Sequence, residues 1–174
     1  MTLKQYQQAA LTTAVYSEQD EIIYPSIGLG EETGEVLGKF KRILRDNNRV
    51  MTKESKKAIA LELGDCMWYL VVLARDLSYE LPTQAPEAGF NSKTIDEAID
   101  DAIILNSAAA ELIVVANHYS WSFTMHIKHS ECMKRISAIA TYLGYSMDDI
   151  MQMNIEKLQG RVERNTIHGS GDNR

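Results

Sequence analysis

Two stretches of this chain carry apolar residues at the spacing of an α-helix, and each also carries a pair of carboxylates. Glu32 and Glu35 lie three residues apart, as do Glu62 and Asp65. At about 100° per residue, each pair falls on one helix face beside the apolar arc. The arcs consist of Leu29, Val36, Phe40 and Ile43, and of Ile59, Leu63, Cys66, Leu70, Leu73 and Leu77. If the arcs pack together, the four carboxylates meet at the rim of the core.

Four carboxylates at close range repel one another, and at least one stays protonated without a counter-charge. An oxygen-only cluster of this kind suits a hard divalent cation. We therefore expect Mg²⁺ here, with Mn²⁺ as a substitute. A solvated acidic face is the plainer interpretation, but it does not require both pairs to border apolar arcs. Lys39 shares the face of Glu32 and Glu35, which makes it a candidate for contacting a phosphate.

Composition limits the partners that this chain can take. Its 174 residues, 45% hydrophobic and 24% charged, suit one domain over 1–174 with a sizeable core. A net charge of -6 argues against binding long nucleic acid. The N-terminus has no apolar signal region and no apolar run is long enough for a membrane span. Two cysteines without a Cys-x-x-Cys motif indicate a reduced, cytoplasmic protein.

The hydrophobic periodicity predicts an all-α protein, a helical bundle of about five to six helices. Pro25 is expected to push Tyr24 out of helical geometry, so that the second helix starts near Ser26 or Gly28. The expected helices cover about 2–19, 26–46, 53–81, 95–118, 126–143 and 146–164, with N-caps at Thr2, Thr52, Thr94 and Ser146. Residues 165–174 form a polar tail.

A weak internal similarity relates the two halves of the chain. A shift of 76 residues sets Glu35 over Glu111, and a shift of 66 sets Asp65-Cys-Met over Glu131-Cys-Met. The same shifts replace Glu32 by Ala108 and Glu62 by Lys128. Segment 82–143 is thus either a degenerate second helix pair that lost the carboxylates, or an insert whose similarity arose by chance.

Three motifs together resemble a known family. Gly30-Glu-Glu-Thr-Gly-Glu-Val36, then Leu61-Glu-Leu-Gly-Asp-Cys-Met-Trp-Tyr-Leu70, resemble the two acidic motifs of the MazG-like all-α nucleoside triphosphate pyrophosphohydrolases. Asn154-Ile-Glu-Lys-Leu-Gln-Gly-Arg161 is similar to the end of that family's last core helix. The resemblance covers 1–81 and 144 to the end, and the spacer of 26 residues between the acidic motifs is long for the family.

The resemblance implies the family's architecture and a set of roles. Glu32, Glu35, Glu62 and Asp65 would hold Mg²⁺. Asn154 and Lys157 would reach the substrate phosphates, and Tyr69 would lie near the base. The family usually assembles as dimers or tetramers, so a homo-oligomer is expected.

The leading hypothesis is Mg²⁺-dependent hydrolysis of a nucleoside triphosphate, with a deoxynucleotide favoured, to the monophosphate and pyrophosphate. Glu35 or Glu32 would take the proton of the attacking water. Lys157, Asn154 and Arg161 would steady the leaving pyrophosphate. The alternative is a nucleotide-binding or regulatory protein of the same fold with little turnover. A di-iron bundle is disfavoured, because no histidine follows a glutamate by three residues.

Overall fold

The computed structural model describes residues 1–86, 89, 91–118 and 123–166. Over these residues the chain forms six α-helices and a short 3₁₀ turn at Glu18–Asp20, and no strand. The all-α prediction with five to six helices is confirmed. The helices are α1 (Leu3–Leu11), α2 (Ile23–Asp46), α3 (Lys53–Asp76), α4 (Ile95–His118), α5 (Phe123–Leu143) and α6 (Met147–Glu163).

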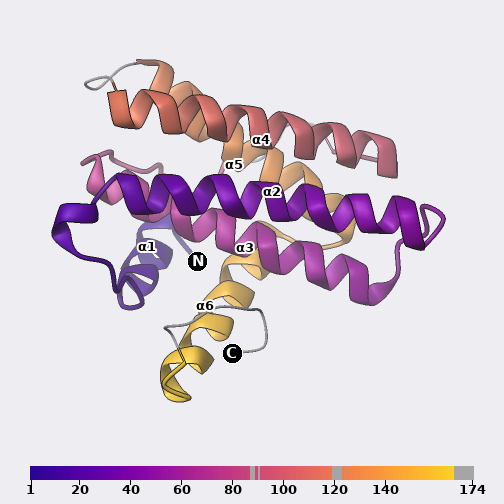
Figure 1. Ribbon diagram of the computed structural model, residues 1–174, viewed down its shortest axis with the longest axis horizontal. Helices are drawn as coiled ribbons and strands as arrows, with labels where there is room; N and C mark the ends of the chain where they lie inside the picture. Colours follow the sequence, from indigo (N-terminus) through magenta and orange to yellow (C-terminus); the bar gives the residue numbers. More distant parts are fainter. Residues whose placement is uncertain (87–88, 90, 119–122, 167–174) are drawn as a thin grey trace.

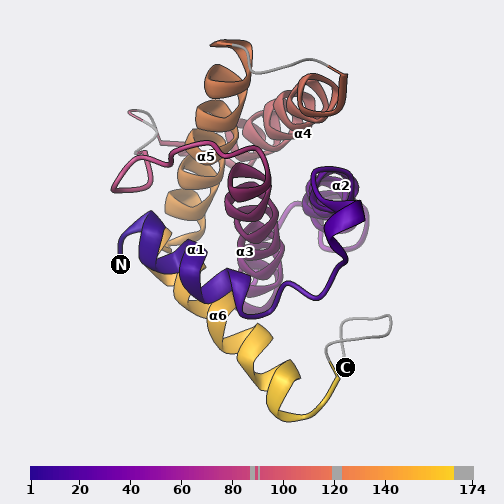
Figure 2. The same ribbon diagram turned by 90° about the vertical axis from the view of Figure 1, so that its left-hand side faces the viewer.

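Four of the helices form the main bundle. Helices α2 and α3 are joined by a short turn and run side by side in opposite directions, and α4 lies along α2 (Figure 1). Helix α5 packs against both α4 and α3. The two remaining helices, α1 and α6, cover the side of α3 that faces away from α4 (Figure 2). Helix α3 is therefore enclosed by the other five.

The burial of α3 follows from its sequence. Its apolar residues are not confined to one stripe, and those between Ile59 and Ala74 line the core on several sides. Trp68 takes part as well, since its indole nitrogen donates to the Thr13 hydroxyl at 2.9 Å and to the Ala10 carbonyl at 3.2 Å. These bonds fix the end of α1 against the middle of α3.

The predicted N-caps are confirmed. The hydroxyls of Thr2, Thr52 and Ser146 each accept a hydrogen bond from the backbone N–H three residues on, and the residue there bonds back to the cap. Thr94 accepts from the Glu97 N–H at 3.2 Å, and the Glu97 carboxylate accepts from the Thr94 N–H. The last of these caps sets where α6 begins, and α6 carries part of the site.

Two helices end earlier than the periodicity predicts. Helix α1 stops at Leu11 rather than near residue 19, because the hydroxyls of Thr12 and Thr13 donate to the carbonyls three residues back at 2.7 Å. Helix α3 stops at Asp76 rather than Leu81. There Ser78 adopts a φ of 53°, and the chain turns away from the helix axis.

Two helices begin earlier than predicted. Tyr24 lies inside α2, so the expectation that Pro25 displaces it is wrong. Pro25 occupies the first turn, where a backbone N–H has no intrahelical partner to lose. The start is set by Ile22, whose φ of 65° turns the chain into the helix. Helix α5 begins at Phe123 rather than His126.

Segment 82–143 contributes a second helix pair, α4 and α5, to the same bundle. Whether this pair is a degenerate copy of α2 and α3 stays a prediction. Residues 167–174, most of the predicted polar tail, lie outside the described residues. None of the helices in the described part of the chain is both long and apolar enough to cross a membrane.

Candidate functional site

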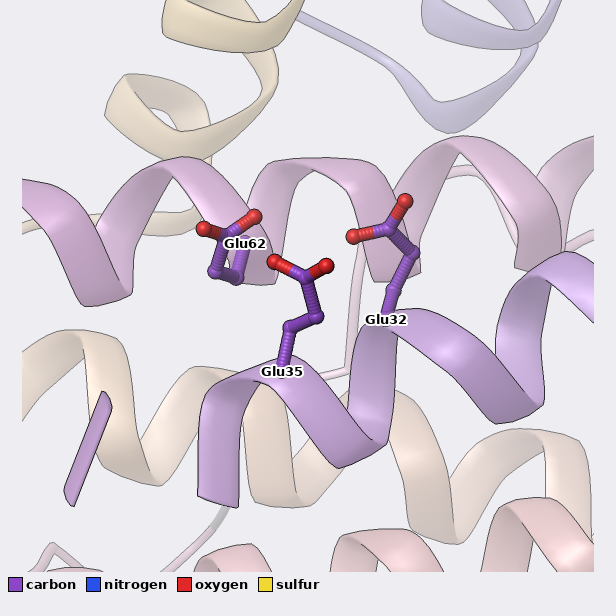
Figure 3. A group of neighbouring side chains, drawn as sticks. All are labelled: Glu32, Glu35 and Glu62. Carbon is purple, nitrogen blue, oxygen red and sulfur yellow. The ribbon is translucent and has the colours of Figure 1, made fainter. Parts of the chain in front are cut away.

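Three of the four predicted carboxylates meet between α2 and α3. Glu32, Glu35 and Glu62 each place one carboxylate oxygen within 4.8 Å of the other two (Figure 3). Glu32 and Glu35 lie one helical turn apart, so both project from α2 toward α3. Glu62 is buried, at 6% exposed, and meets them from α3. The acidic group, as we call these three residues, is thus assembled by the packing of two neighbouring helices.

Asp65, the fourth predicted ligand, lies beside the acidic group but is bound by α6. One carboxylate oxygen accepts a hydrogen bond from the Asn154 side-chain amide at 2.8 Å. The other forms an ion pair with the Lys157 ammonium. The structure therefore joins Asp65 to two residues that the sequence assigned to the substrate.

Lys39 contacts a carboxylate of the acidic group. Its ammonium lies 2.7 Å from a Glu62 oxygen, and both side chains are largely buried. The sequence placed Lys39 on the correct helix face but did not predict this ion pair. An ammonium so close to Glu62 offsets part of the negative charge between the helices.

The acidic group remains short of positive charge. Burial raises the pKa of Glu32 to about 8, and the nearby Asp65 and Glu62 carboxylates raise it further. Burial also raises the pKa of Asp65, although Lys157 opposes this shift. Near neutral pH, Glu32 holds a proton that a bound cation would displace.

Helix α6 presents three polar residues to the site along one face. Asn154, Lys157 and Arg161 follow one another at spacings of three and four residues, which places them on the same side. Asn154 is 1% exposed and lies directly over α3. This approach requires Gly64, because a Cβ atom there would come within 3.0 Å of the Asn154 Cβ.

An aromatic pocket adjoins the carboxylates. Glu32, Asp65 and Arg161 form its polar part. Its remaining lining is mostly aromatic and apolar and consists of Thr13, Val15, Tyr24, Trp68, Tyr69 and Leu158. The Trp68 and Tyr69 rings meet edge to face at 4.9 Å between centroids, and Tyr24 lies 6.3 Å from Tyr69. Predicted site residues Tyr69 and Arg161 therefore lie together beside the carboxylates.

Gly28 makes room for one wall of this pocket. A Cβ atom at position 28 would lie 2.2 Å from two atoms of the Tyr69 ring. The ring therefore rests directly on the backbone of α2. Burial raises the pKa of the Tyr69 hydroxyl, and the neighbouring Tyr24 adds to this effect.

Sequence reasoning missed several pocket residues, although a signal for one was present. Tyr24, Gly28 and Glu32 are spaced four residues apart, which puts them on one helix face. The expectation of a break at Pro25 concealed that spacing. Trp68 and Thr13 join the pocket only through the contact of α1 with α3, which no local pattern reveals.

One known protein is similar to this chain over a considerable length. The Gene 37 protein of Mycobacterium phage L5 is 40% identical over 84 residues, which make up 45% of this chain and 74% of the phage protein. The chain belongs to the family of this phage protein. No protein-family model matches the chain. No solved structure matches it either.

Membership in the Gene 37 family brings no chemistry with it, because the name of the phage protein states no activity. The described side chains are therefore the basis for a functional proposal. They supply an oxygen-rich acidic group, two lysines, a buried amide and an aromatic pocket, all within one region of the bundle.

Proposed function

We propose that this protein hydrolyses a nucleoside triphosphate, with a deoxynucleotide favoured, to a nucleoside monophosphate and pyrophosphate, using Mg²⁺. The observation that carries the proposal is the convergence of Glu32, Glu35 and Glu62 within 4.8 Å between two helices. The resemblance to MazG-like pyrophosphohydrolases agrees with this chemistry. A homo-oligomer and a cytoplasmic location belong to the same proposal, the latter supported by the two free, buried cysteines.

The residues present fit a divalent cation. The donors are carboxylate oxygens, which Mg²⁺ and Mn²⁺ prefer over nitrogen or sulfur. The raised pKa of Glu32, about 8, indicates that Lys39 and Lys157 do not fully offset the carboxylates. Glu32, Glu35 and Glu62 would hold the ion, and Asp65 would join them once Lys157 turns to the substrate.

The chain's residues divide the work of hydrolysis. Bound Mg²⁺ would neutralise phosphate oxygens and lower the pKa of the attacking water. Glu35 or Glu32 accepts the proton from that water as its oxygen attacks the α-phosphorus and the bond to the bridging oxygen of the β-phosphate breaks. Lys157 and Arg161 offset the charge that builds on the departing pyrophosphate.

The aromatic pocket provides a place for the base beside the phosphates. Tyr69 and Trp68 offer ring faces and edges for stacking, and stacking on aromatic rings tolerates any base. Arg161 stands at the polar end of the pocket with Glu32 and Asp65, between the base and the acidic group. Lys39 lies on the opposite side of that group, where it contacts Glu62.

A panel of nucleoside and deoxynucleoside triphosphates with Mg²⁺ tests the proposal by measuring pyrophosphate release. Glu35→Gln should abolish release, whereas Glu111→Gln should retain it. Glu111 is a matched control, since it lies at the corresponding position of α4 and pairs with Lys128 at 3.0 Å. Release of orthophosphate alone, or equal loss in both variants, would contradict the proposal. Binding without hydrolysis would support the nucleotide-binding alternative.

A further inference from the structure

A buried tyrosine lies behind the polar face of α6. Tyr6 of α1 has no exposed surface, and its hydroxyl lies where α1, α3 and α6 meet. It donates a hydrogen bond to the side-chain oxygen of Asn154 at 2.8 Å, and the Gly64 carbonyl lies further away at 3.4 Å. A hydroxyl has one proton to donate, and the shorter contact takes it.

The orientation of the Asn154 amide is fixed from both ends. An ionised carboxylate only accepts hydrogen bonds, so Asp65 must face the NH₂ end of the amide. The oxygen end is then left facing α1, where it would be buried without a donor if Tyr6 had no hydroxyl. Asn154 is 1% exposed, so water has little access to replace that donor. The hydroxyl and the carboxylate thus hold the amide in one of its two orientations.

We propose that Tyr6 is a positioning residue, which holds the Asn154 amide so that Asn154 in turn holds the Asp65 carboxylate beside the acidic group. The relay runs from α1 through α6 to α3 over two hydrogen bonds of 2.8 Å each. It acts on the opposite oxygen of Asp65 from Lys157. Asp65 therefore stays in place when Lys157 leaves it.

This relay gives the short helix α1 a role in the site. Thr2 caps α1, and the indole of Trp68 holds its last turn through Ala10 and Thr13. The Tyr6 ring is packed in the core, so its hydroxyl has a fixed position from which to orient the amide. The proposal rests on the function proposed above, because it assigns Asp65 to the cation and the phosphates.

The test uses Tyr6→Phe, which removes one oxygen and keeps the ring in the core. The matched control is Ser26→Ala, which also removes one buried hydroxyl, the acceptor of an Asn117 amide bond between α2 and α4 at 2.8 Å. The full-length protein is labelled with ¹⁵N, and the Asn154 side-chain amide is followed by its chemical shifts and hydrogen exchange. Affinity for Mn²⁺ is measured on the same samples by electron paramagnetic resonance.

We expect Tyr6→Phe to shift the Asn154 amide signal, speed its exchange and weaken Mn²⁺ binding about fivefold to tenfold, the effect of one buried hydrogen bond. Ser26→Ala should change none of these. In an Asn154→Ala background, Tyr6→Phe should weaken Mn²⁺ binding no further, since its effect passes through the amide.

An unchanged Asn154 signal in Tyr6→Phe would overturn the inference, and so would equal losses of Mn²⁺ affinity in Tyr6→Phe and Ser26→Ala. A wild-type protein that binds no Mn²⁺ would instead overturn the proposed function. The amide signal would still decide whether Tyr6 orients Asn154.

Discussion

The two helix pairs of the bundle offer charged residues at matching positions but treat them differently. Between α4 and α5, acidic residues are paired with cations. Lys128 lies 3.0 Å from Glu111, and Arg135 lies 2.7 Å from Asp101. Between α2 and α3, three carboxylates crowd within 4.8 Å, and burial raises the pKa of Glu32 to about 8. One pair is neutralised and the other retains excess negative charge.

The difference depends on two positions. The residue that corresponds to Glu62 in the second pair is Lys128, and the residue that corresponds to Glu32 is Ala108. One change supplies a cation and the other removes a carboxylate, and together they convert a repulsive group into an ion pair. A helix pair alone therefore does not make a site, because the excess of buried negative charge is what invites a divalent cation.

The strongest way to break the contrast is Glu62→Lys, which gives α3 the residue found at the corresponding position of α5. We expect pyrophosphate release to fall about a thousandfold, at the upper end for loss of one preorganised electrostatic group. The reason is that a third ammonium would neutralise the acidic group and exclude the cation. Steady-state rates at saturating Mg²⁺ measure the effect. Lys128→Met is the control, and a comparable loss there would mean that the two pairs are not distinct.

Lys157→Met tests the cation that α6 contributes. Loss of a charge-assisted contact worth about 1.5–3 kcal/mol should lower kcat/KM roughly tenfold to a hundredfold. The metal-free protein should also lose thermal stability, because Asp65 is left buried without its ammonium. Mg²⁺ should restore more stability to this variant than to wild type, as measured by calorimetry. If Mg²⁺ restores the two equally, Lys157 does not compete with the ion.

Gly28→Ala sharpens the comparison at the aromatic pocket. The added methyl group would displace the Tyr69 ring, which its Cβ meets at 2.2 Å. We expect a severalfold higher KM for the nucleotide with a smaller change in kcat. Gly34→Ala on the same helix is the control, since nothing lies within 4 Å of its added Cβ. That variant should instead gain up to about 1 kcal/mol in stability from helix propensity. Equal KM values in the two variants would remove the pocket from the substrate site.

The pH dependence of stability gives the smallest expected effect. The pKa of Glu32 is raised in the folded protein to about 8, so folding is favoured by its proton below the ordinary carboxyl range. This contribution is lost as pH rises toward 8, at roughly 1.4 kcal/mol per pKa unit of the shift. Without metal, wild type should therefore lose stability relative to Glu32→Gln between about pH 4.5 and 8. Urea unfolding at several pH values measures it, and a difference that stays constant would contradict the buried acidic group.

Local sequence patterns were sufficient to predict the helices and the acidic group. The caps at Thr2 and Ser146 follow from hydroxyl residues with a partner three positions on. The convergence of Glu32, Glu35 and Glu62 follows from helical spacing beside apolar arcs that pack together. These features depend on neighbours within a turn or two of helix, which a sequence displays directly.

The remaining contacts depend on tertiary packing. Asp65 meets Asn154 and Lys157 across 89 and 92 residues of sequence, and no local rule selects those partners. The same holds for the hydroxyl of Tyr6, 148 residues from Asn154. Lys39 was placed on the correct face, but its Glu62 partner belongs to another helix.

Crystals of the protein grown with Mn²⁺ and measured at the manganese absorption edge test the central claim most directly. The account predicts an anomalous peak between the carboxylates of Glu32, Glu35 and Glu62, lost in Glu62→Lys and retained in Glu111→Gln. A peak elsewhere, or no peak at this position in the wild-type protein, would contradict it.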